Sequence, residues 1–298
     1  MTYLDYNATA PMLPSVRDAM FDALSEPLNP SSVHKHGRRA KKLMEDARAS
    51  IAQAFGAFPN EVLFTASGTE ANNMVLRAFA ADRPLLVSAV EHASVAKTGA
   101  LLGAGVIPVD VEGVVQAATL DRMLQALGKP ALVSIMLAHN ETGVIQPIAA
   151  LADVVHAHGG LLHVDAVQAV GKIPVDWGLL KADMVTVSGH KVGGPIGAAA
   201  LLIRNDLPIR PLITGGKQEL GRRASTENVA TIVGFATAMK EVAGCGLAAR
   251  YKTLRDQLIA AIRASAPEAR LFVFEGVEQL PNTLLVCMPG VSLSLIHI

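Results

Sequence analysis

Apolar and polar positions alternate along the chain in a way that predicts strands and helices in turn. Seven short apolar runs are typical of buried strands, at residues 62–64, 85–87, 106–109, 132–136, 161–164, 184–187 and 199–203. Between them, apolar positions recur at helical spacing, for example over residues 38–55, 70–80, 120–127 and 148–158. This order predicts an α/β fold, in which helices cover both faces of a mostly parallel sheet.

The pattern changes after the last of these runs. A long, alanine-rich helical stretch extends from about Thr226 to about Ser265. Two further strands are expected near residues 271–274 and 283–286. The change predicts a second, smaller domain at the C-terminal end of the chain.

Composition narrows the class of protein. The 298 residues carry 26 Lys and Arg against 26 Asp and Glu, so no basic excess indicates a nucleic acid or an anionic membrane as partner. Mean hydropathy is +0.36, yet no apolar run approaches the roughly 20 residues that span a bilayer. Residues 1–6 do not resemble a signal peptide, and two cysteines, Cys245 and Cys287, cannot build a disulfide framework. We therefore expect a soluble, cytoplasmic protein.

A lysine follows the strand expected at residues 184–187, in the sequence Ser188-Gly189-His190-Lys191 before a Gly/Pro turn. A strand end can aim the Lys191 amine into a cleft, where Ser188 and His190 would hold an anion beside it. Burial lowers the pKa of a lysine and frees a nucleophilic amine, which suits a Schiff base. The simpler alternative is a surface lysine on a turn.

Polar residues also follow the strand expected at residues 62–64. Gly68 allows close approach of the backbone, Thr69 offers a hydroxyl, and the helix that begins there presents free N–H groups. This combination suits a phosphate, because helix N-termini attract anions. The alternative is an ordinary cap, with Thr69 capping its own helix.

Three further strand ends carry candidate chemistry. Asp165 ends an apolar strand and needs a cationic partner if buried, such as a protonated pyridine nitrogen; otherwise it caps the next helix. Gln168 is close enough in sequence to reach the same ligand. His92 suits ring stacking or proton transfer, and Asn140 suits orienting a ligand, although both types also occur as ordinary structural residues. Pyridoxal 5′-phosphate needs such a phosphate cradle, ring acid, stacking histidine and amine.

The chain resembles the fold-type-I pyridoxal-phosphate enzymes of the class V aminotransferase group, and within it the NifS/IscS-like cysteine desulfurases. Eight segments carry the resemblance in order: Tyr3 to Thr9; Asn29 to His34 with Gly37; Ser67 to Glu70 with Asn73; Glu91-His92; Asn140 to Gly143; His163 to Ala166 with Gln168; Ser188 to Lys191; and Gly221 to Asn228. The resemblance implies a large cofactor-binding domain at residues 14–255. It also implies a small α+β domain, here incomplete, at residues 1–13 and 256–298.

The resemblance implies a role for each candidate residue. Lys191 would hold the cofactor as a Schiff base, Asp165 would pair with the pyridinium nitrogen, and His92 would stack on the ring and shuttle protons. The remaining ligands it implies are Gln168 and Asn140 near the phenolic oxygen, and Gly68, Thr69, Ser188 and His190 at the phosphate. Thr226 would reach the phosphate in a partner subunit, which implies a homodimer with shared sites. Ser225 stands where the family motif usually has glycine.

By the same resemblance, the enzyme would convert L-cysteine to L-alanine. A cysteine thiolate on the enzyme would take the sulfur as a persulfide and pass it to an acceptor. Acceptors of this kind are an iron–sulfur scaffold or a tRNA-thiolation protein. The alternatives are a related enzyme on the same cofactor, such as selenocysteine lyase, aminotransferase or kynureninase, and an inactive subunit that binds a sulfur-transfer partner.

The chain departs from the family at its end. The family pattern stops near residues 289–292, and residues 293–298 do not continue it, so we expect a truncated or misassembled gene end. The nucleophilic cysteine loop and a carboxylate-binding arginine are not found. Cys245 and Cys287 lack an activating context, so this chain is expected to be inactive in desulfuration.

Histidine spacing does not predict a metal site. The pairs His34 and His36, and His156 and His158, are two residues apart and lack further ligands at metal-binding spacing. We therefore expect these four histidines to be structural or solvated.

Overall fold

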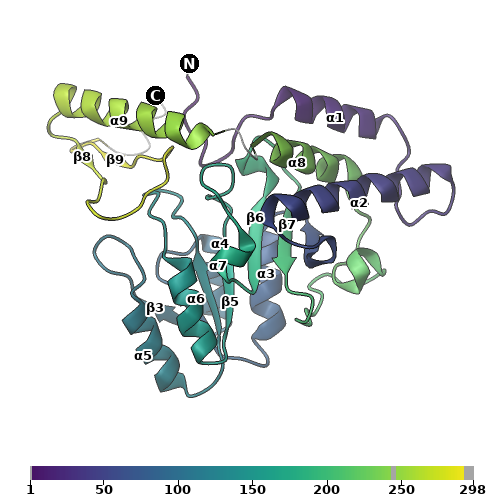
Figure 1. The fold of residues 1–298 in the computed structure, drawn as a ribbon, viewed down its shortest axis with the longest axis horizontal. Helices are drawn as coiled ribbons and strands as arrows, with labels where there is room; N and C mark the ends of the chain where they lie inside the picture. The colour runs from purple at the N-terminus through teal and green to yellow at the C-terminus, as the bar shows by residue number, and fades with distance from the viewer. Residues whose placement is uncertain (1, 243–245, 292–298) are drawn as a thin grey trace.

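A computed structural model describes residues 2–242 and 246–291, and a seven-stranded sheet lies at its centre (Figure 1). The strand order is β1-β7-β6-β5-β4-β2-β3. Pairing is parallel from β6 through β5, β4 and β2 to β3, whereas β7 runs antiparallel to both β6 and β1. The strands are β1 (Val62–Thr65), β2 (Leu85–Ser88), β3 (Gly105–Ile107), β4 (Leu132–Met136), β5 (Leu161–Asp165), β6 (Met184–Ser188) and β7 (Ala199–Ile203). The predicted α/β class is confirmed.

Helices cover both faces of this sheet because its strands are apolar on both sides. Alternate strand residues enter two separate buried clusters. Those of one face, such as Phe64 and Leu202, pack with α2, α5, α6 and α8, and those of the other, such as Leu63 and Leu201, pack with α3 and α4. The bounds are α1 (Pro14–Leu24), α2 (Lys35–Phe55), α3 (Gly68–Phe79), α4 (Ala93–Leu101), α5 (Ala117–Leu127), α6 (Ile148–Ala157), α7 (Trp177–Leu180) and α8 (Val229–Val242).

The C-terminal part of the chain differs from the expected pattern. The single long helix expected from Thr226 to Ser265 is two helices, α8 and α9 (Leu247–Ser265), whose axes differ by 76°. Gly246, with a φ of +57°, precedes α9 in the left-handed conformation that glycine adopts without strain. The two late strands are shorter than expected, β8 (Arg270–Leu271) pairing antiparallel with β9 (Val286–Cys287).

This small sheet and α9 lie together at one end of the molecule (Figure 1). Two contacts tie the segment before β9 to the large sheet's loops: Ile145 N donates to Glu278 O at 2.9 Å, and Leu280 N donates to Gly143 O at 2.7 Å. We keep as a proposal the division into a large domain at residues 14–255 and a small domain at residues 1–13 and 256–298. The separate two-stranded sheet supports it.

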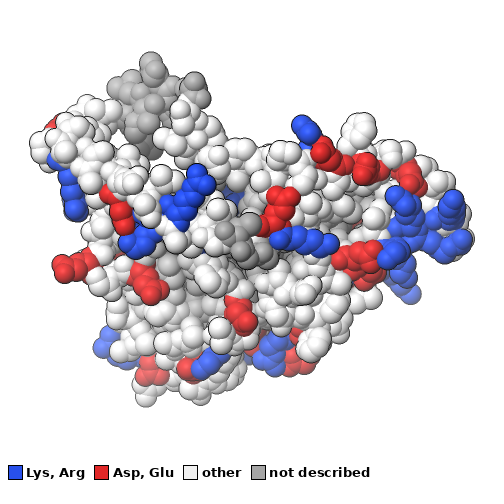
Figure 2. Space-filling view, turned by 45° about the horizontal axis from the view of Figure 1, so that its top comes forward, with Lys and Arg blue, Asp and Glu red and all other residues white. Residues whose placement is uncertain are grey.

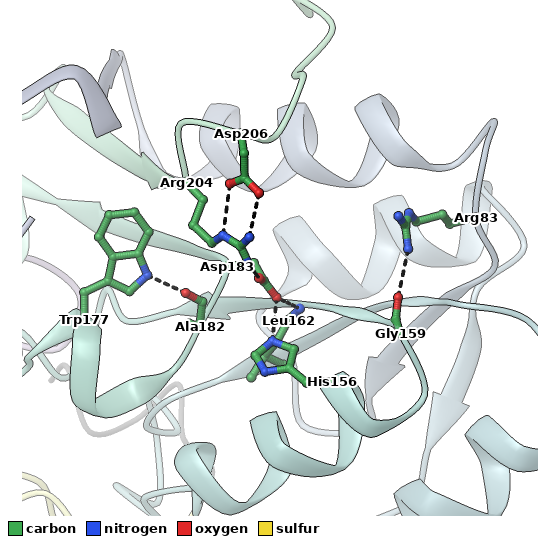
Figure 3. Close-up of polar contacts among 9 residues, drawn as sticks. All are labelled: Arg83, His156, Gly159, Leu162, Trp177, Ala182, Asp183, Arg204 and Asp206. Carbon is green, nitrogen blue, oxygen red and sulfur yellow. Dashed lines mark hydrogen bonds and ion pairs between the residues drawn. The ribbon is translucent and has the colours of Figure 1, made fainter. Parts of the chain in front are cut away.

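A buried carboxylate braces the amino-terminal end of the sheet (Figure 3). Asp183, directly before β6, is 1% exposed. Its Oδ2 atom accepts from Leu162 N at 2.7 Å and contacts His156 Nε2 at 3.0 Å, and its Oδ1 atom accepts from Arg204 Nη1 at 2.7 Å. Because these partners come from β5, α6 and the end of β7, one side chain fastens three elements at the edge opposite the strand ends predicted to carry the chemistry.

Surface charge is uneven. Figure 2 shows Lys and Arg gathered at the end of the molecule where α2 begins, beside a broad face of uncharged residues. The first turns of α2 contain Lys35, Arg38, Arg39, Lys41 and Lys42. Among the described residues, no single helix has the length and hydropathy of a membrane span, and only α8 and α9 taken together across their bend reach both.

Candidate active site

One cavity of about 330 Å³ opens where β1, β2, β4, β5 and β6 end at their carboxyl termini. This is the edge at which open parallel sheets bind ligands. Among its lining residues are nine of those predicted from the sequence to bind a cofactor: Gly68, Thr69, His92, Asn140, Asp165, Gln168, Ser188, His190 and Lys191. The loops after separate strands therefore bring these residues together. Their individual roles stay predictions.

Asp165 is one of the residues that line the cavity. Its side chain is buried, and burial raises the pKa of its carboxyl group, with opposition from Asn72, the Val167 N–H, His92 and Lys191. Asn72 Nδ2 donates to Asp165 Oδ2 at 2.7 Å, and Val167 N donates to Oδ1 at 3.0 Å. A carboxylate held in this way favours a positively charged partner in the cavity, because charge pairing offsets the cost of burial.

Lys191 also lines the cavity, and it lies on the short helical turn after β6. Its amine donates to the carbonyl oxygens of Asn7 and Ala8, the latter at 2.9 Å. Burial lowers the pKa of the Lys191 amine, while the charges of Asp165 and Asp5 raise it. A half-buried amine with a lowered pKa is available as a nucleophile closer to neutral pH than a free lysine.

The start of α3, which also lines the cavity, suits an anion. Ser67, not Thr69, caps α3, because its Oγ accepts from Glu70 N at 3.1 Å. The Thr69 side chain is therefore not needed as the helix cap, and the first N–H groups of α3 have no partner within the helix. Gly68 fits closely here, since a Cβ atom on it would meet Val167 Cγ2 at 3.1 Å.

Ser188 and His190 complete this end of the cavity. Ser188 is buried, and His190 is half-buried with its Nδ1 atom 3.3 Å from Thr9 Oγ1. Burial, and then the charges of Lys191 and Lys172, lower the pKa of His190, so its ring is neutral at neutral pH and offers one N–H donor. Backbone donors, hydroxyls and a buried carboxylate opposite an amine fit pyridoxal phosphate, which carries a phosphate, a ring nitrogen and an aldehyde.

His92 and Asn140 occupy the rim. His92 caps α4, with its Nδ1 accepting from Ser94 N at 3.2 Å, and Ser94 Oγ also accepts from Asn72 Nδ2 at 2.9 Å. Asn140 lies in the turn after β4, and its carbonyl accepts from Asn7 Nδ2 at 3.0 Å. Each of these two residues therefore has an ordinary structural role, which was the alternative considered from the sequence, and each also lines the cavity.

Thr226 is not brought to this cavity in the same chain. It is exposed, on a segment that Arg223 fastens to α3 by donating Nε to Glu70 Oε1 at 2.8 Å. Ser225 beside it has a φ of +93°, a backbone conformation that favours glycine. The departure from the family motif at this position is thus a point of backbone strain.

Sequence reasoning missed two residues that organise the site. Asn72 bridges Asp165 and Ser94, although only Asn73 entered the resemblance; its position one helical turn after Gly68 was the available signal. Asn7 is held by Asn140, Thr283 and Asn282, and its carbonyl accepts from both Gln168 and Lys191. Asn7 lies in the first segment that carries the resemblance, but no role was predicted for it, because its partners come from distant parts of the chain.

Cys287 and the four closely spaced histidines, His34, His36, His156 and His158, do not line this cavity. Cys287 is exposed on β9, and Cys245 and residues 293–298 lie outside the described residues. Cys287 does not line the cavity of Lys191. The histidines have ordinary partners: His34 caps α2, and the other three pair with Glu26, Asp183 and Asp121 (His36, His156 and His158).

Comparisons with known proteins identify the family of this chain. The chain matches the family Aminotransferase class-V over residues 2–297. A cysteine desulfurase of Cereibacter sphaeroides is 41% identical over 296 residues, covering 95% of this chain and 76% of that protein. The X-ray structure of a NifS-like protein from Rickettsia africae has a TM-score of 0.92 at 36% identity, covering 99% of this chain and 83% of that one.

The structure of SspA in complex with cysteine is also similar, with a TM-score of 0.79 at 31% identity over 88% of this chain and 78% of that one. The fold and the family match define a class V aminotransferase of fold type I. Within that class, the chain belongs to the NifS/IscS-like cysteine desulfurase family. The resemblance seen in the sequence is confirmed.

Proposed function

We propose that this chain binds pyridoxal 5′-phosphate and serves the conversion of L-cysteine to L-alanine, with the sulfur passed on as a persulfide. The observation that carries the proposal is that Lys191 and Asp165 line one cavity together with the N-terminus of α3. The family supports the same reaction, and so does the bound cysteine of the similar SspA structure.

Each residue contributes a separate part of binding. Gly68, Thr69, Ser188 and His190 would hold the phosphate through backbone and side-chain donors. Asp165 would keep a proton on the ring nitrogen, and Gln168 and Asn140 would donate to oxygens of the ring and substrate. When bound, pyridoxal phosphate supplies an electron sink for the substrate's Cα.

Two groups are placed to move protons. The Lys191 amine, with its lowered pKa, accepts a proton and returns it close to the substrate carbon. The His92 ring lines the cavity and is joined to Asp165 through Ser94 and Asn72; because Nδ1 is engaged by Ser94, Nε2 is the nitrogen left for a ligand. For proton transfer, the protein's contribution is the position of these two groups in the cavity.

Cofactor binding is tested by absorption spectroscopy. The purified protein reconstituted with pyridoxal phosphate should show a yellow band that disappears in Lys191→Ala. Lys97→Ala, an exposed lysine on α4, is the matched control and should keep the band. A colourless wild-type protein would show the proposal to be wrong.

Turnover of cysteine is a separate part of the proposal. The 298 residues are proposed to release little sulfide from cysteine, because the two cysteines of the sequence have no activating context and Cys287 does not line the cavity. Sulfide and alanine are the products to measure, with Cys287→Ser as the comparison. Strong sulfide release by the wild type, lost in Cys287→Ser, would contradict this part.

The oligomeric state, the sulfur acceptor and the cellular location are also part of the proposal. The exposed Thr226 segment supports a homodimer in which each subunit completes the site of the other. The IscS-like family supports an acceptor protein for iron–sulfur assembly or tRNA thiolation. A cytoplasmic location is supported by the two cysteines, which build no disulfide framework.

A further inference from the structure

Lys172 is a buried lysine that the proposed chemistry does not use. It follows β5 on the turn that begins at Ala166, and its side chain is only 7% exposed. Burial, reinforced by the charge of Lys191, lowers the pKa of Lys172 to about 7. A buried amine is costly, so its place needs a reason beyond packing.

The partner of this amine is Gln168, one turn earlier. Lys172 Nζ donates to Gln168 Oε1 at 3.3 Å. On the other side of the same amide, Gln168 Nε2 donates to the carbonyl of Asn7 at 2.8 Å. That carbonyl also accepts from the Lys191 amine. A continuous series of hydrogen bonds therefore joins the buried amine to the reactive lysine.

The two ends of this series leave one orientation for the amide. A flipped Gln168 would place its oxygen against the carbonyl oxygen of Asn7, so acceptor would face acceptor. Its NH₂ group would then meet the Lys172 amine, and donor would face donor whenever that amine is protonated. Asn7 itself is fixed by Asn140, Thr283 and Asn282. The second N–H of Gln168 is then free for the cavity, which this side chain lines.

We propose that Lys172 is a positioning residue, which orients the Gln168 amide so that its N–H groups face the Asn7 carbonyl and the ligand cavity. The cavity ligand rests on the proposed function, but the orientation of Gln168 does not. The titratable groups around this series are Lys191, His190, Asp165 and Asp5. Lys172→Met removes the donor and keeps an apolar chain of similar length.

The first test needs no cofactor. In protein labelled with ¹⁵N-glutamine, the Gln168 side-chain signals are those lost in Gln168→Glu. Lys172→Met should speed hydrogen exchange of these NH₂ protons by roughly tenfold or more, because the amide loses one of its two fixed partners. Lys97→Met is the matched control and should leave the rate unchanged. An unchanged rate in folded Lys172→Met would overturn the proposal.

The second test uses the pyridoxal-phosphate complex. Lys172→Met should raise the midpoint of the pH titration of the visible band by roughly one pH unit. The Gln168 N–H, no longer held towards the ligand, would stabilise the deprotonated form of the bound cofactor less. In a Gln168→Ala background, Lys172→Met should add no further shift. Equal shifts in both backgrounds would mean that Lys172 acts by charge alone, and the positioning role would be wrong.

A third variant guards against loss of folding. Lys172→Gln keeps an N–H donor while removing the charge, and it should retain most of the protection of the Gln168 protons. Circular dichroism checks each variant. If wild-type protein shows no visible band, the proposed function fails, and the exchange measurement on the cofactor-free protein alone decides the role of Lys172.

Discussion

At the scale of single residues, Ser225 carries backbone strain beside a segment expected to be functional. Its φ of +93° lies beyond the left-handed helical region near +57° that non-glycine residues occasionally adopt. Three other non-glycine residues with positive φ, Lys181, Glu219 and Leu220, lie between +47° and +58°. A serine at this position therefore costs conformational energy that glycine would not.

Ser225→Gly should raise the free energy of unfolding by about 1 kcal/mol, because the strain is relieved. Urea denaturation measures the change. Ser25→Gly is the control, since Ser25 has an ordinary φ of −70° and substitution there should give no gain. A loss of stability in Ser225→Gly would show that the serine side chain contributes more than its backbone costs.

Glu91 joins the ends of two strands. Its Oε1 atom accepts from Ser88 Oγ at 2.5 Å and from Met136 N at 2.7 Å, while its Oε2 atom is buried without a partner among the described residues. Burial raises the pKa of Glu91 to about 8, with the Ser88 hydrogen bond opposing and the charge of Asp165 adding to the rise. The carboxyl group is therefore protonated at neutral pH.

This shift predicts a pH dependence of stability. The folded protein holds the Glu91 proton more tightly than the unfolded chain, so the stability from Glu91 is fully present below its ordinary pKa of 4.5 and is lost as the pH rises through about 8. Glu91→Gln is neutral throughout and should lack this decline. Urea midpoints across that range should give curves for wild type and variant that diverge; parallel curves would contradict the shifted pKa.

At the scale of secondary-structure elements, the sequence predicted the interior better than the ends. The bounds of β4 and β7 were predicted to the residue, because strands apolar on both faces are visible as uninterrupted runs. The start of α2 was placed three residues late, since the cap that begins it is the His34 side chain, which accepts from Gly37 N. The break between α8 and α9 was missed although two glycines, Gly244 and Gly246, stand in the sequence just before α9 and are a signal for a helix end.

The same limit applies to the site. Strand ends are visible in a sequence, so Asp165 and Lys191 were found on the correct edge of the sheet. Asn7 was not assigned a role, because its importance comes from hydrogen bonds to residues more than a hundred positions away. The local sequence pattern thus predicts at which edge of the sheet a residue lies, whereas its hydrogen-bond partners are set by tertiary contacts.

The amino-terminal edge of the sheet gives a prediction at this scale. Asp183→Ala should lower the free energy of unfolding by about 1–3 kcal/mol, because it leaves the buried Leu162 N–H without an acceptor and removes a partner of Arg204 and His156. Asp206→Ala removes the exposed partner of the same arginine and should cost about 1 kcal/mol or less. Neither variant should change pyridoxal-phosphate affinity, since Asp183 lies at the other edge of the sheet. Equal losses of stability would contradict the assigned bracing role.

At the scale of the whole molecule, one region has the features of a contact surface for a second chain. A cavity of about 470 Å³ lies between α2 and the loop at residues 217–222, above the buried ion pair of Arg48 and Glu219. Side-chain atoms of Gln218, Arg222 and Glu227 that line it are buried yet have no partner among the described residues. Buried polar atoms without partners are costly, so a rearrangement that pairs them, such as one on binding a second chain, would be stabilising.

The homodimer with shared sites that we propose is supported by the exposed Thr226 beside this cavity. Sedimentation should give twice the chain's 31.2 kDa. Thr226→Ala should weaken pyridoxal-phosphate binding by roughly tenfold or more, because one hydrogen bond to the phosphate is lost from the partner's site. A sedimenting mass equal to one chain would contradict the dimer.

Mixed dimers decide whether the sites are shared. A dimer with Lys191→Ala in one chain and Thr226→Ala in the other, purified through two different tags, would contain one site with both changes and one with neither. Half of its sites should therefore bind pyridoxal phosphate with wild-type affinity, and the yellow band should reach half its full height at low cofactor concentration. If Thr226 instead served its own chain, each site would carry one change, and no site would bind with wild-type affinity. The cofactor titration of this mixed dimer therefore distinguishes a site built by two chains from a site built by one.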